Sequence, residues 1–175
     1  MAKTLTIKLA DIKQYRPTAE LDGARWEPFC LEAHDQDLRP ILGDGLYYDF
    51  MTKYLVTGDA MYSAYQNLLN GTTYTYDGQT IYFDGLKPMI VYFTLARFVQ
   101  NNPVHITRYG IVTKTNAQST PSDPVIVRQV VNELRSNAVN YKNQVDKYLL
   151  QNQTTYPLYI GSNTSIKTGF RMFQG

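Results

Sequence analysis

GLKPMIVYFTLARFVQNN, residues 85–102, is the longest nearly uncharged stretch of the chain. Its apolar residues recur at spacings of three and four, which predicts a helix, and Pro88 suits the first turn of that helix, where a missing N–H breaks no bond. Apolar side chains occur all around the helix, with only Lys87, Arg97 and Gln100 to face water, so other elements must cover it. Because a membrane span needs roughly 20 apolar residues, this stretch is too short to be one. We expect the central helix of a soluble domain.

The size and charge of the chain exclude several classes of protein. Its 175 residues fit one domain plus extensions. A formal net charge of +2 is too small to make nucleic acid the main partner. The single cysteine, Cys30, excludes an intramolecular disulfide framework and fits a reducing compartment. The first residues, MAKTLTIKLADIK, are polar and lack the apolar core of a signal peptide.

Tyrosine is the unusual component, with 15 residues against one tryptophan. A tyrosine side chain joins an apolar ring to a polar hydroxyl, so it suits half-buried surfaces and wet interfaces. Because the tyrosines lie inside periodic apolar patterns, a low-complexity segment is not indicated. An interface protein and a tyrosine-rich core are the two interpretations that remain open.

Helices account for most of the remaining pattern. Residues 18–37 predict a helix that Pro28 kinks or splits. In the segment 37–54, Leu38, Leu42 and Leu46 share one face, followed by Phe50 or Tyr54, and the glycines at 43 and 45 either leave room for another backbone or break the helix before a second one begins near Asp44. Residues 59–70 predict a short helix that ends at Asn70-Gly71.

The period changes to two after this helix. Alternating β-formers surround Asp77-Gly78, a two-residue turn of the I′ type, so residues 73–83 predict a β-hairpin. Two isolated strands are marginal in water, so the hairpin must pack on helices or on another subunit. Further along, Ile106 to Thr113 favours a single strand.

Asp123-Pro124 marks the start of the longest helix, which we expect to run to about Asn152 with one apolar stripe. The predicted fold is therefore mainly α: a small bundle of about four to five helices with a long C-terminal helix, a β-hairpin, and extended N- and C-terminal arms. We expect a helical-bundle domain over residues 1–152 and an extended tail over 153–175.

The two arms and the hairpin are the candidate sites for partners. Residues 3–9 alternate Leu5, Ile7 and Leu9 with polar residues, which predicts a strand or arm that pairs with a neighbour or lies against its own domain. The tail ends in Phe-Arg-Met-Phe, residue types that anchor interfaces, and it could dock on its own domain or on a partner. The predicted partner-binding residues are Phe170, Arg171, Met172, Phe173, Tyr74, Tyr76, Leu5 and Ile7.

No segment predicts catalysis, a metal or a cofactor. Cys30 lies beside Phe29 and Leu31, as a small buried hydrophobe does. His34 has acidic neighbours but lacks the spacing of metal ligands, so we expect it at a solvated helix end. His105 has no acidic neighbour, and no nucleophile or metal-hydrolase motif surrounds either histidine.

Three segments resemble a known family, the head–tail connector (adaptor) proteins of tailed bacteriophages, in particular those of crAss-like phages and prophages of gut Bacteroides-like bacteria. The resemblance is carried by DLRPILGDGLYYD at 37–49, by GLKP at 85–88 with VYFTLARF after it, and by GIVTK at 110–114. It covers roughly residues 5–150 in order and brings no active site with it.

The resemblance implies a structural role. Such proteins form a ring, usually dodecameric, under the portal, where the ring extends the DNA channel and offers a docking platform to a tail-side ring or tail protein. The DNA passes without sequence recognition, and the chain would be found at the head–tail junction of virions assembled in the host cytoplasm. In related adaptors C-terminal extensions reach onto the portal, which would give residues 170–173 a pocket. The alternative is another virion structural protein, such as a tail-completion or head-decoration protein.

Overall fold

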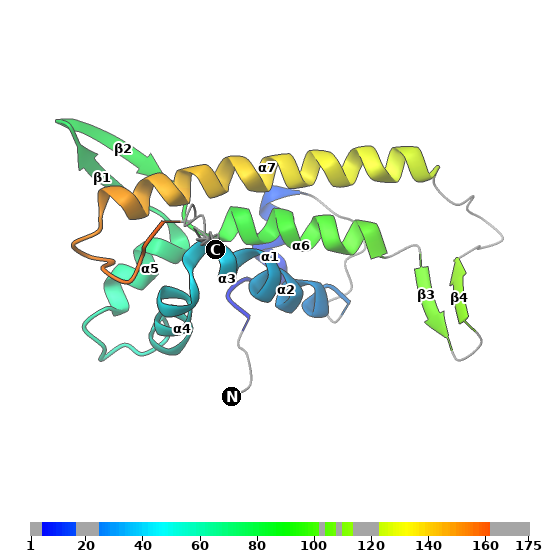
Figure 1. The fold of residues 1–175 in the computed structure, drawn as a ribbon, viewed down its shortest axis with the longest axis horizontal. Coiled ribbons are helices and arrows are strands. Elements are labelled where there is room, and N and C mark those ends of the chain that lie inside the picture. The colour runs from blue at the N-terminus through cyan, green and yellow to red at the C-terminus, as the bar shows by residue number, and fades with distance from the viewer. Residues whose placement is uncertain (1–4, 17–24, 102–103, 108–109, 114–122, 162–175) are drawn as a thin grey trace, which may run out of the picture.

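Helices make up most of the structure, a computed structural model that describes residues 5–16, 25–101, 104–107, 110–113 and 123–161. The fold is mainly α, with a long C-terminal helix and a β-hairpin, as predicted (Figure 1). In chain order the elements are α1 (Leu9–Tyr15), α2 (Glu27–Ala33), the π-helix η1 (His34–Leu38), α3 (Arg39–Leu42), α4 (Asp44–Lys53), α5 (Tyr62–Asn70), β1 (Thr72–Tyr76), β2 (Gln79–Phe83), α6 (Lys87–Asn101), β3 (Val104–Thr107), β4 (Gly110–Thr113) and α7 (Pro124–Gln151).

The central helix is α6, as its sequence predicts. It packs along α7 and against α1, α2 and η1 (Figure 1), and Met89, Ile90 and Val91 are completely enclosed. Of the three residues expected to face water, Gln100 is exposed and Lys87 and Arg97 are partly buried, and each of them also reaches a neighbouring element. Lys87 pairs with Asp11 at 3.0 Å, Arg97 with Asp37 at 2.8 Å, and Gln100 accepts a hydrogen bond from Arg135. The polar residues of α6 therefore tie the helices around it together.

In the segment 27–53, α2, η1 and α3 follow one another without a break from Glu27 to Leu42, and α4 comes after Gly43. Pro28 occupies the first turn of α2, where it costs no hydrogen bond, so it begins this helix and does not kink it; residues 18–24 of the predicted helix lie outside the described residues. Gly43 separates α3 from α4 with φ +75°, and the new helix begins at Asp44. The predicted face is confirmed and includes both alternatives for its end, because the side chains of Leu38, Leu42, Leu46, Phe50 and Tyr54 are all buried.

The hairpin β1–β2 has the predicted register and turn. Tyr76 pairs with Gln79, and both residues between them, Asp77 and Gly78, have positive φ, as a type I′ turn requires. At its base two glycines touch. A Cβ on Gly71 would lie 2.5 Å from the carbonyl oxygen of Phe83, and one on Gly85 would lie 2.5 Å from the backbone nitrogen of Gly71. This close approach joins α5 and α6 to the hairpin.

A second hairpin replaces the single strand expected over 106–113. Strands β3 and β4 pair antiparallel, with Thr107 opposite Gly110. The single-strand prediction failed because the run is interrupted by a two-residue connection, Arg108-Tyr109, that lacks the Asn-Gly or Asp-Gly signal. The hairpin lies beyond the ends of α6 and α7 that face it (Figure 1).

Helix α7 starts as predicted, since the Asp123 side chain accepts a hydrogen bond from the backbone N–H of Val125 at 2.8 Å. The chain after it does not leave the domain at residue 152. Tyr156 and Tyr159 are buried in the common core, so residues 153–161 belong to the folded unit and the predicted boundary after 152 lies too early. Residues 162–175, including the Phe-Arg-Met-Phe sequence, lie outside the described residues.

The N-terminal arm also belongs to the core. Residues 5–8 form no strand, and α1 begins at Leu9. Ile7 is 1% exposed and Leu5 packs against the core cluster. Ile7 as a partner-binding residue is therefore wrong, because its own domain encloses the side chain. Within the described segments no helix combines the length and the apolar character needed to cross a membrane.

Candidate functional site

The surface formed by β1–β2 and the C-terminal half of α7 is the candidate functional site. One face of the hairpin rests on the helix: the Phe83 ring stacks on Tyr148 with centroids 4.0 Å apart, and the Tyr74 ring meets Tyr148 edge to face at 5.2 Å. The Tyr74 hydroxyl donates to Oε1 of Gln151 at 2.6 Å. Burial, together with Tyr148, raises the pKa of Tyr74. Tyr74 thus anchors the hairpin to its own helix; its side chain is only partly buried, and its role in partner binding stays a prediction.

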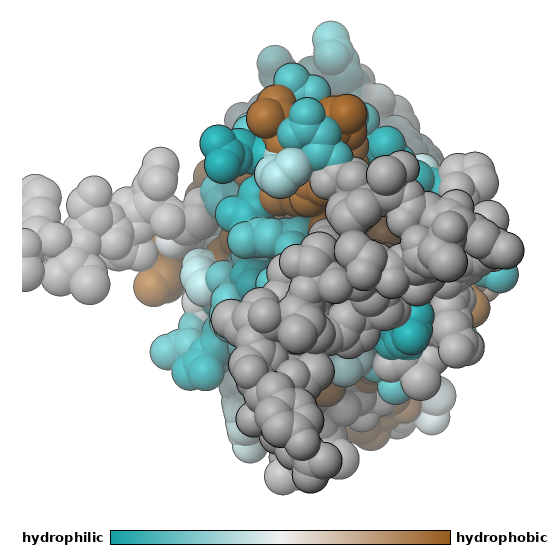
Figure 2. All heavy atoms as spheres, turned by 90° about the vertical axis from the view of Figure 1, so that its right-hand side faces the viewer, coloured by the Kyte–Doolittle hydropathy of each residue, from teal (hydrophilic) through white to brown (hydrophobic). Residues whose placement is uncertain are grey.

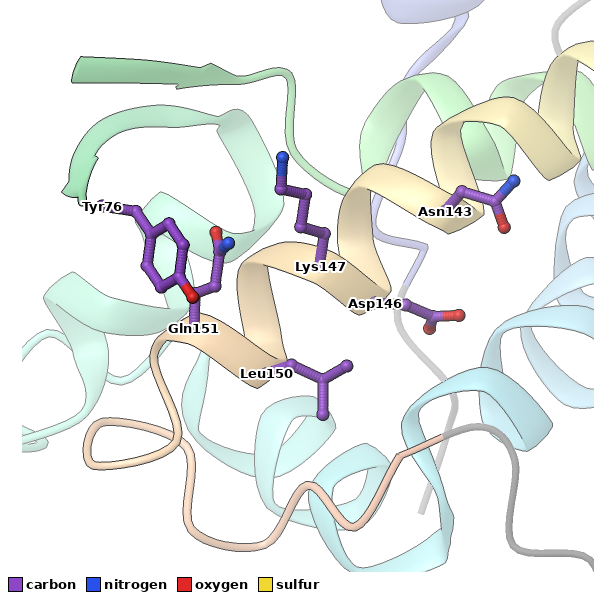
Figure 3. A pocket seen from close by; sticks show the side chains of 6 residues that line it. All are labelled: Tyr76, Asn143, Asp146, Lys147, Leu150 and Gln151. Atoms are coloured by element: carbon purple, nitrogen blue, oxygen red, sulfur yellow. The ribbon is translucent and has the colours of Figure 1, made fainter. Parts of the chain in front are cut away.

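Tyr76, two residues further along β1, is free for other contacts. It is 50% exposed and lines an open pocket of about 580 Å³ between the hairpin tip and α7. Figure 3 shows the Tyr76 ring beside Gln151, with Lys147 and Leu150 pointing to opposite sides. Asn143 and Asp146 complete the lining. Among the predicted partner-binding residues that the structure describes, Tyr76 has the accessibility that the prediction needs.

The pocket continues toward the segment after α7. The Tyr159 hydroxyl donates to Oδ1 of Asp146 at 2.7 Å, and Lys142 donates to the other carboxylate oxygen of Asp146 at 2.7 Å. These bonds hold residues 156–161 beside the helix. Leu150, Leu158 and Ile160 are exposed nearby in sequence, with Ile160 at 73%. The site therefore offers aliphatic and aromatic surface next to paired charges, a composition that suits contact with another protein.

The sequence did not single out Leu150 and Lys147. The sequence does contain a signal for Leu150. The apolar residues of the long helix are spaced three or four apart and lead to Leu149, and Leu150 lies outside this stripe. A large aliphatic side chain beside the stripe, rather than in it, indicates exposed apolar surface.

On the opposite face of the hairpin the described side chains are exposed to solvent. Successive residues of a strand point to opposite faces, so Thr73, Thr75, Thr80 and Tyr82 turn away from α7. All four are exposed, and Tyr82 reaches 71%. The sheet has only two strands, β1 and β2, so each of them keeps one outer edge without a strand partner among the described residues.

One polar cluster inside the core resembles a reactive site but lacks its chemistry. The Oγ1 of Thr6 and the Sγ of Cys30 lie 2.9 Å and 3.7 Å from Nε2 of His34, and both Cys30 and His34 are completely buried. Burial raises the pKa of the Cys30 thiol to about 12, so the thiolate that a nucleophile needs does not form near neutral pH. The cluster is structural, and the expected solvated position of His34 is wrong. Cys30 is buried, as expected.

No metal site is present in the described part of the chain, where no three histidine, cysteine or carboxylate side chains converge. His105 lies in β3, and its side chain is outside the described residues. The residues Phe170, Arg171, Met172 and Phe173 are likewise outside.

Comparison with known proteins places the chain in a family. The profile of a family of unknown function (DUF6712) matches residues 38–169, which run from the end of η1 past the last described residue. No curated protein and no solved structure matches the chain significantly. The match includes both hairpins, α6 and α7, and it leaves out α1, α2 and residues 170–175.

Proposed function

The chain belongs to the DUF6712 family, whose function is unknown, and from its own residues we propose that it is a non-enzymatic structural protein of a tailed-phage virion. In this proposal copies of the chain form a dodecameric ring between the portal and the tail. The ring extends the DNA channel and is the platform on which a tail-side ring or tail protein docks.

The observation that carries the proposal is the surface of β1–β2 and the end of α7. It combines unpaired strand edges with exposed Tyr76, Leu150 and Ile160. Exposed strand edges and exposed apolar side chains are a liability in a free monomer, because they promote uncontrolled association. In a subunit of a larger assembly the same features become contacts. The resemblance of residues 37–49, 85–98 and 110–114 to head–tail connectors gives that assembly its proposed identity.

The charge of the chain is compatible with a channel wall. A formal net charge of +2 over 175 residues offers little attraction to phosphate, and each phosphate that a protein neutralises strengthens its hold on DNA. A nearly neutral ring lets DNA slide past without sequence recognition. In the proposal, residues 170–173 of each copy bind the portal.

Imaging of assembled particles from the phage or prophage that encodes the chain tests the location. We expect a closed ring of this chain between portal and tail. Density for it at the capsid surface would identify a head-decoration protein, and density at the tail end would identify a tail-completion protein. Either result would contradict the connector proposal.

The portal contact has its own test. We expect deletion of Gly169–Gly175 to weaken binding to purified portal at least about tenfold, as the loss of an interface anchor does. The thermal midpoint should stay that of the full chain, because every described core contact is made by residue 161 or earlier. Unchanged portal binding by the truncated chain would contradict the anchor role.

A further inference from the structure

Each of the two hairpins has free strand edges that could pair with the other hairpin in a neighbouring copy of the chain. We propose that β1–β2 of one copy joins β3–β4 of the next copy, edge to edge, so that the contact between copies is a four-stranded sheet. The inference rests on the proposed ring, because it names the contact that would close it.

The free edges of β1–β2 follow from its register. Tyr76 and Gln79 flank the two-residue turn and form its hydrogen-bonded pair. In an antiparallel ladder hydrogen-bonded and non-hydrogen-bonded pairs alternate, so the pairs Thr75–Thr80 and Thr73–Tyr82 turn their backbone N–H and C=O groups outward. Each outer edge thus presents two residues with outward backbone donors and acceptors, and among these groups the Thr73 carbonyl already accepts a long bond from the Thr72 hydroxyl at 3.3 Å. All four residues are exposed, so a strand from another chain can reach them.

The second hairpin, β3–β4, has outward backbone groups in the same pattern and packs less on the rest of the chain. Thr107 and Gly110 flank its two-residue connection, so the backbone groups of Ile106 and Val104 on β3, and of Ile111 and Thr113 on β4, turn outward. Within the described residues β3 and β4 contact each other extensively and any helix at most marginally. Since two isolated strands are marginal in water and three or more are stable, pairing with a further hairpin supplies the missing stabilisation.

Their positions fit a head-to-tail contact. The hairpin β1–β2 stands at the end of the molecule where α7 finishes, and β3–β4 lies at the opposite end (Figure 1). The 28 residues of α7 separate the two ends, which corresponds to about 42 Å of helix. Viewed from the β3–β4 end, the surface mixes hydrophobic and hydrophilic side chains (Figure 2); Val125 and Ile126, at the start of α7, are both more than half exposed. A contact between different ends of the same molecule generates a ring when its rotation closes.

Charge decides which hairpin pairs with which. Residues 72–84 contain two acidic residues, Asp77 and Asp84, and no lysine or arginine. Residues 104–114 contain two basic residues, Arg108 and Lys114, and no aspartate or glutamate. Pairing of like hairpins would bring equal charges together, whereas pairing of unlike hairpins brings opposite charges together. The sequence therefore favours the heterologous contact over a symmetric dimer through either hairpin.

Proline substitution at an outward-facing position tests the edges. Thr75→Pro removes an outward N–H from β1 and Thr80→Pro removes one from β2, and neither breaks a bond inside the hairpin. Self-association of the full chain is measured by sedimentation velocity over a range of concentrations. Each hairpin uses only one of its two outer edges in the contact. We therefore expect one of Thr75→Pro and Thr80→Pro to weaken association about tenfold, because a backbone group of the interface loses its partner. On the other hairpin we expect the same of one of Ile106→Pro and Ile111→Pro. Thr75→Ala and Thr80→Ala keep the N–H and should associate like the wild-type chain.

A charge variant gives an independent readout if a proline disturbs folding. Asp77→Asn keeps a residue that tolerates positive φ at the turn and removes one acidic charge. We expect it to weaken association several-fold at low ionic strength and to leave it unchanged at about 1 M salt, where charges are screened.

The outcomes separate this inference from the ring itself. If all four prolines and Asp77→Asn associate like the wild-type chain while circular dichroism shows them folded, the pairing of hairpins is wrong. A wild-type chain that stays monomeric at every soluble concentration also overturns the pairing. If particles nevertheless contain a ring of this chain, the connector proposal holds and its subunits meet through a different contact. If the chain is absent from the portal–tail junction, the connector proposal alone is wrong.

Discussion

Buried hydroxyl groups show what the tyrosines of this chain contribute. Among the described residues six tyrosine side chains are buried: Tyr47, Tyr54, Tyr65, Tyr148, Tyr156 and Tyr159. They form much of the core, so the tyrosine-rich core, one of the two interpretations that the composition left open, holds for them. Tyr76 and Tyr82 are exposed and remain available to an interface. A buried tyrosine stabilises a fold only if its hydroxyl finds a partner.

The same substitution at two buried tyrosines should give different results. The Tyr156 hydroxyl donates to the carbonyl of Ala64 at 2.7 Å and lies 3.2 Å from the Tyr148 hydroxyl. Tyr156→Phe removes the hydroxyl that bonds the Ala64 carbonyl and takes away the partner of the buried Tyr148 hydroxyl, so we expect the free energy of unfolding to fall by about 1–3 kcal/mol. The Tyr54 hydroxyl is buried without a hydrogen-bond partner among the described residues, so Tyr54→Phe should cost nothing measurable. Urea unfolding of both variants measures the difference; equal losses would contradict the assignment of the Tyr156 bonds.

Cys30 makes the stability of the fold depend on pH in the alkaline range. Burial raises the pKa of its thiol to about 12, whereas in the unfolded chain a thiol has a pKa of about 8.5. The stabilisation is fully present below the unfolded pKa and is lost as pH rises toward the folded pKa, because only the unfolded state releases its proton in that range. Between pH 9 and 11 we expect unfolding free energy to fall by about 1 kcal/mol per pH unit more in the wild-type chain than in Cys30→Val. Parallel pH profiles from thermal melts would contradict this contribution.

At the scale of elements, the base of the β1–β2 hairpin depends on two glycines. Gly71 has φ +92°, and a Cβ there would meet backbone atoms of Phe83 and Asp84 at 2.5–2.8 Å. Backbone cannot rotate away as a side chain can, and positive φ adds strain for any other residue. We expect Gly71→Ala to destabilise the chain by about 3 kcal/mol or more. Gly58→Ala is the matched control, because a Cβ at Gly58 meets nothing within 4 Å. A Gly71→Ala chain that melts like Gly58→Ala would show that the two segments can separate.

Local signals explain which elements could be predicted. Asp123-Pro124, Gly43 and Asp77-Gly78 act through the geometry of a few neighbouring residues, so the start of α7, the break before α4 and the first hairpin were all predictable. The π-helix η1, the approach of Gly71 to Gly85 and the burial of His34 were not. The last two depend on residues that are not neighbours in the chain, such as Thr6 beside His34, and helical periodicity carries no information about them. The fold class could be read from sequence, whereas the contacts that complete its core could not.

At the scale of the whole molecule, the prediction of the candidate site was limited for the same reason. A polar–apolar alternation identified both Tyr76 and Ile7 as residues for partners, but it cannot tell a solvent-facing row from one that covers its own domain. The structure separates them, with Tyr76 half exposed and Ile7 enclosed. The surface on α7 that faces Tyr76 was missed because it forms only when strand and helix, distant in sequence, meet.

The extent of the folded unit gives the last prediction. Tyr156 and Tyr159 pack in the common core, and their hydroxyls bind Ala64 and Asp146. A chain that ends at Gly161 keeps all of these contacts, so we expect its melting temperature to match that of the full chain. A chain that ends at Asn152 loses two buried aromatic side chains, and since truncating one such side chain costs about 3–5 kcal/mol, it should be largely unfolded at 25 °C. Circular dichroism melts of the two truncated chains make the comparison. If both melt like the full chain, residues 153–161 are an independent tail and the core ends with α7.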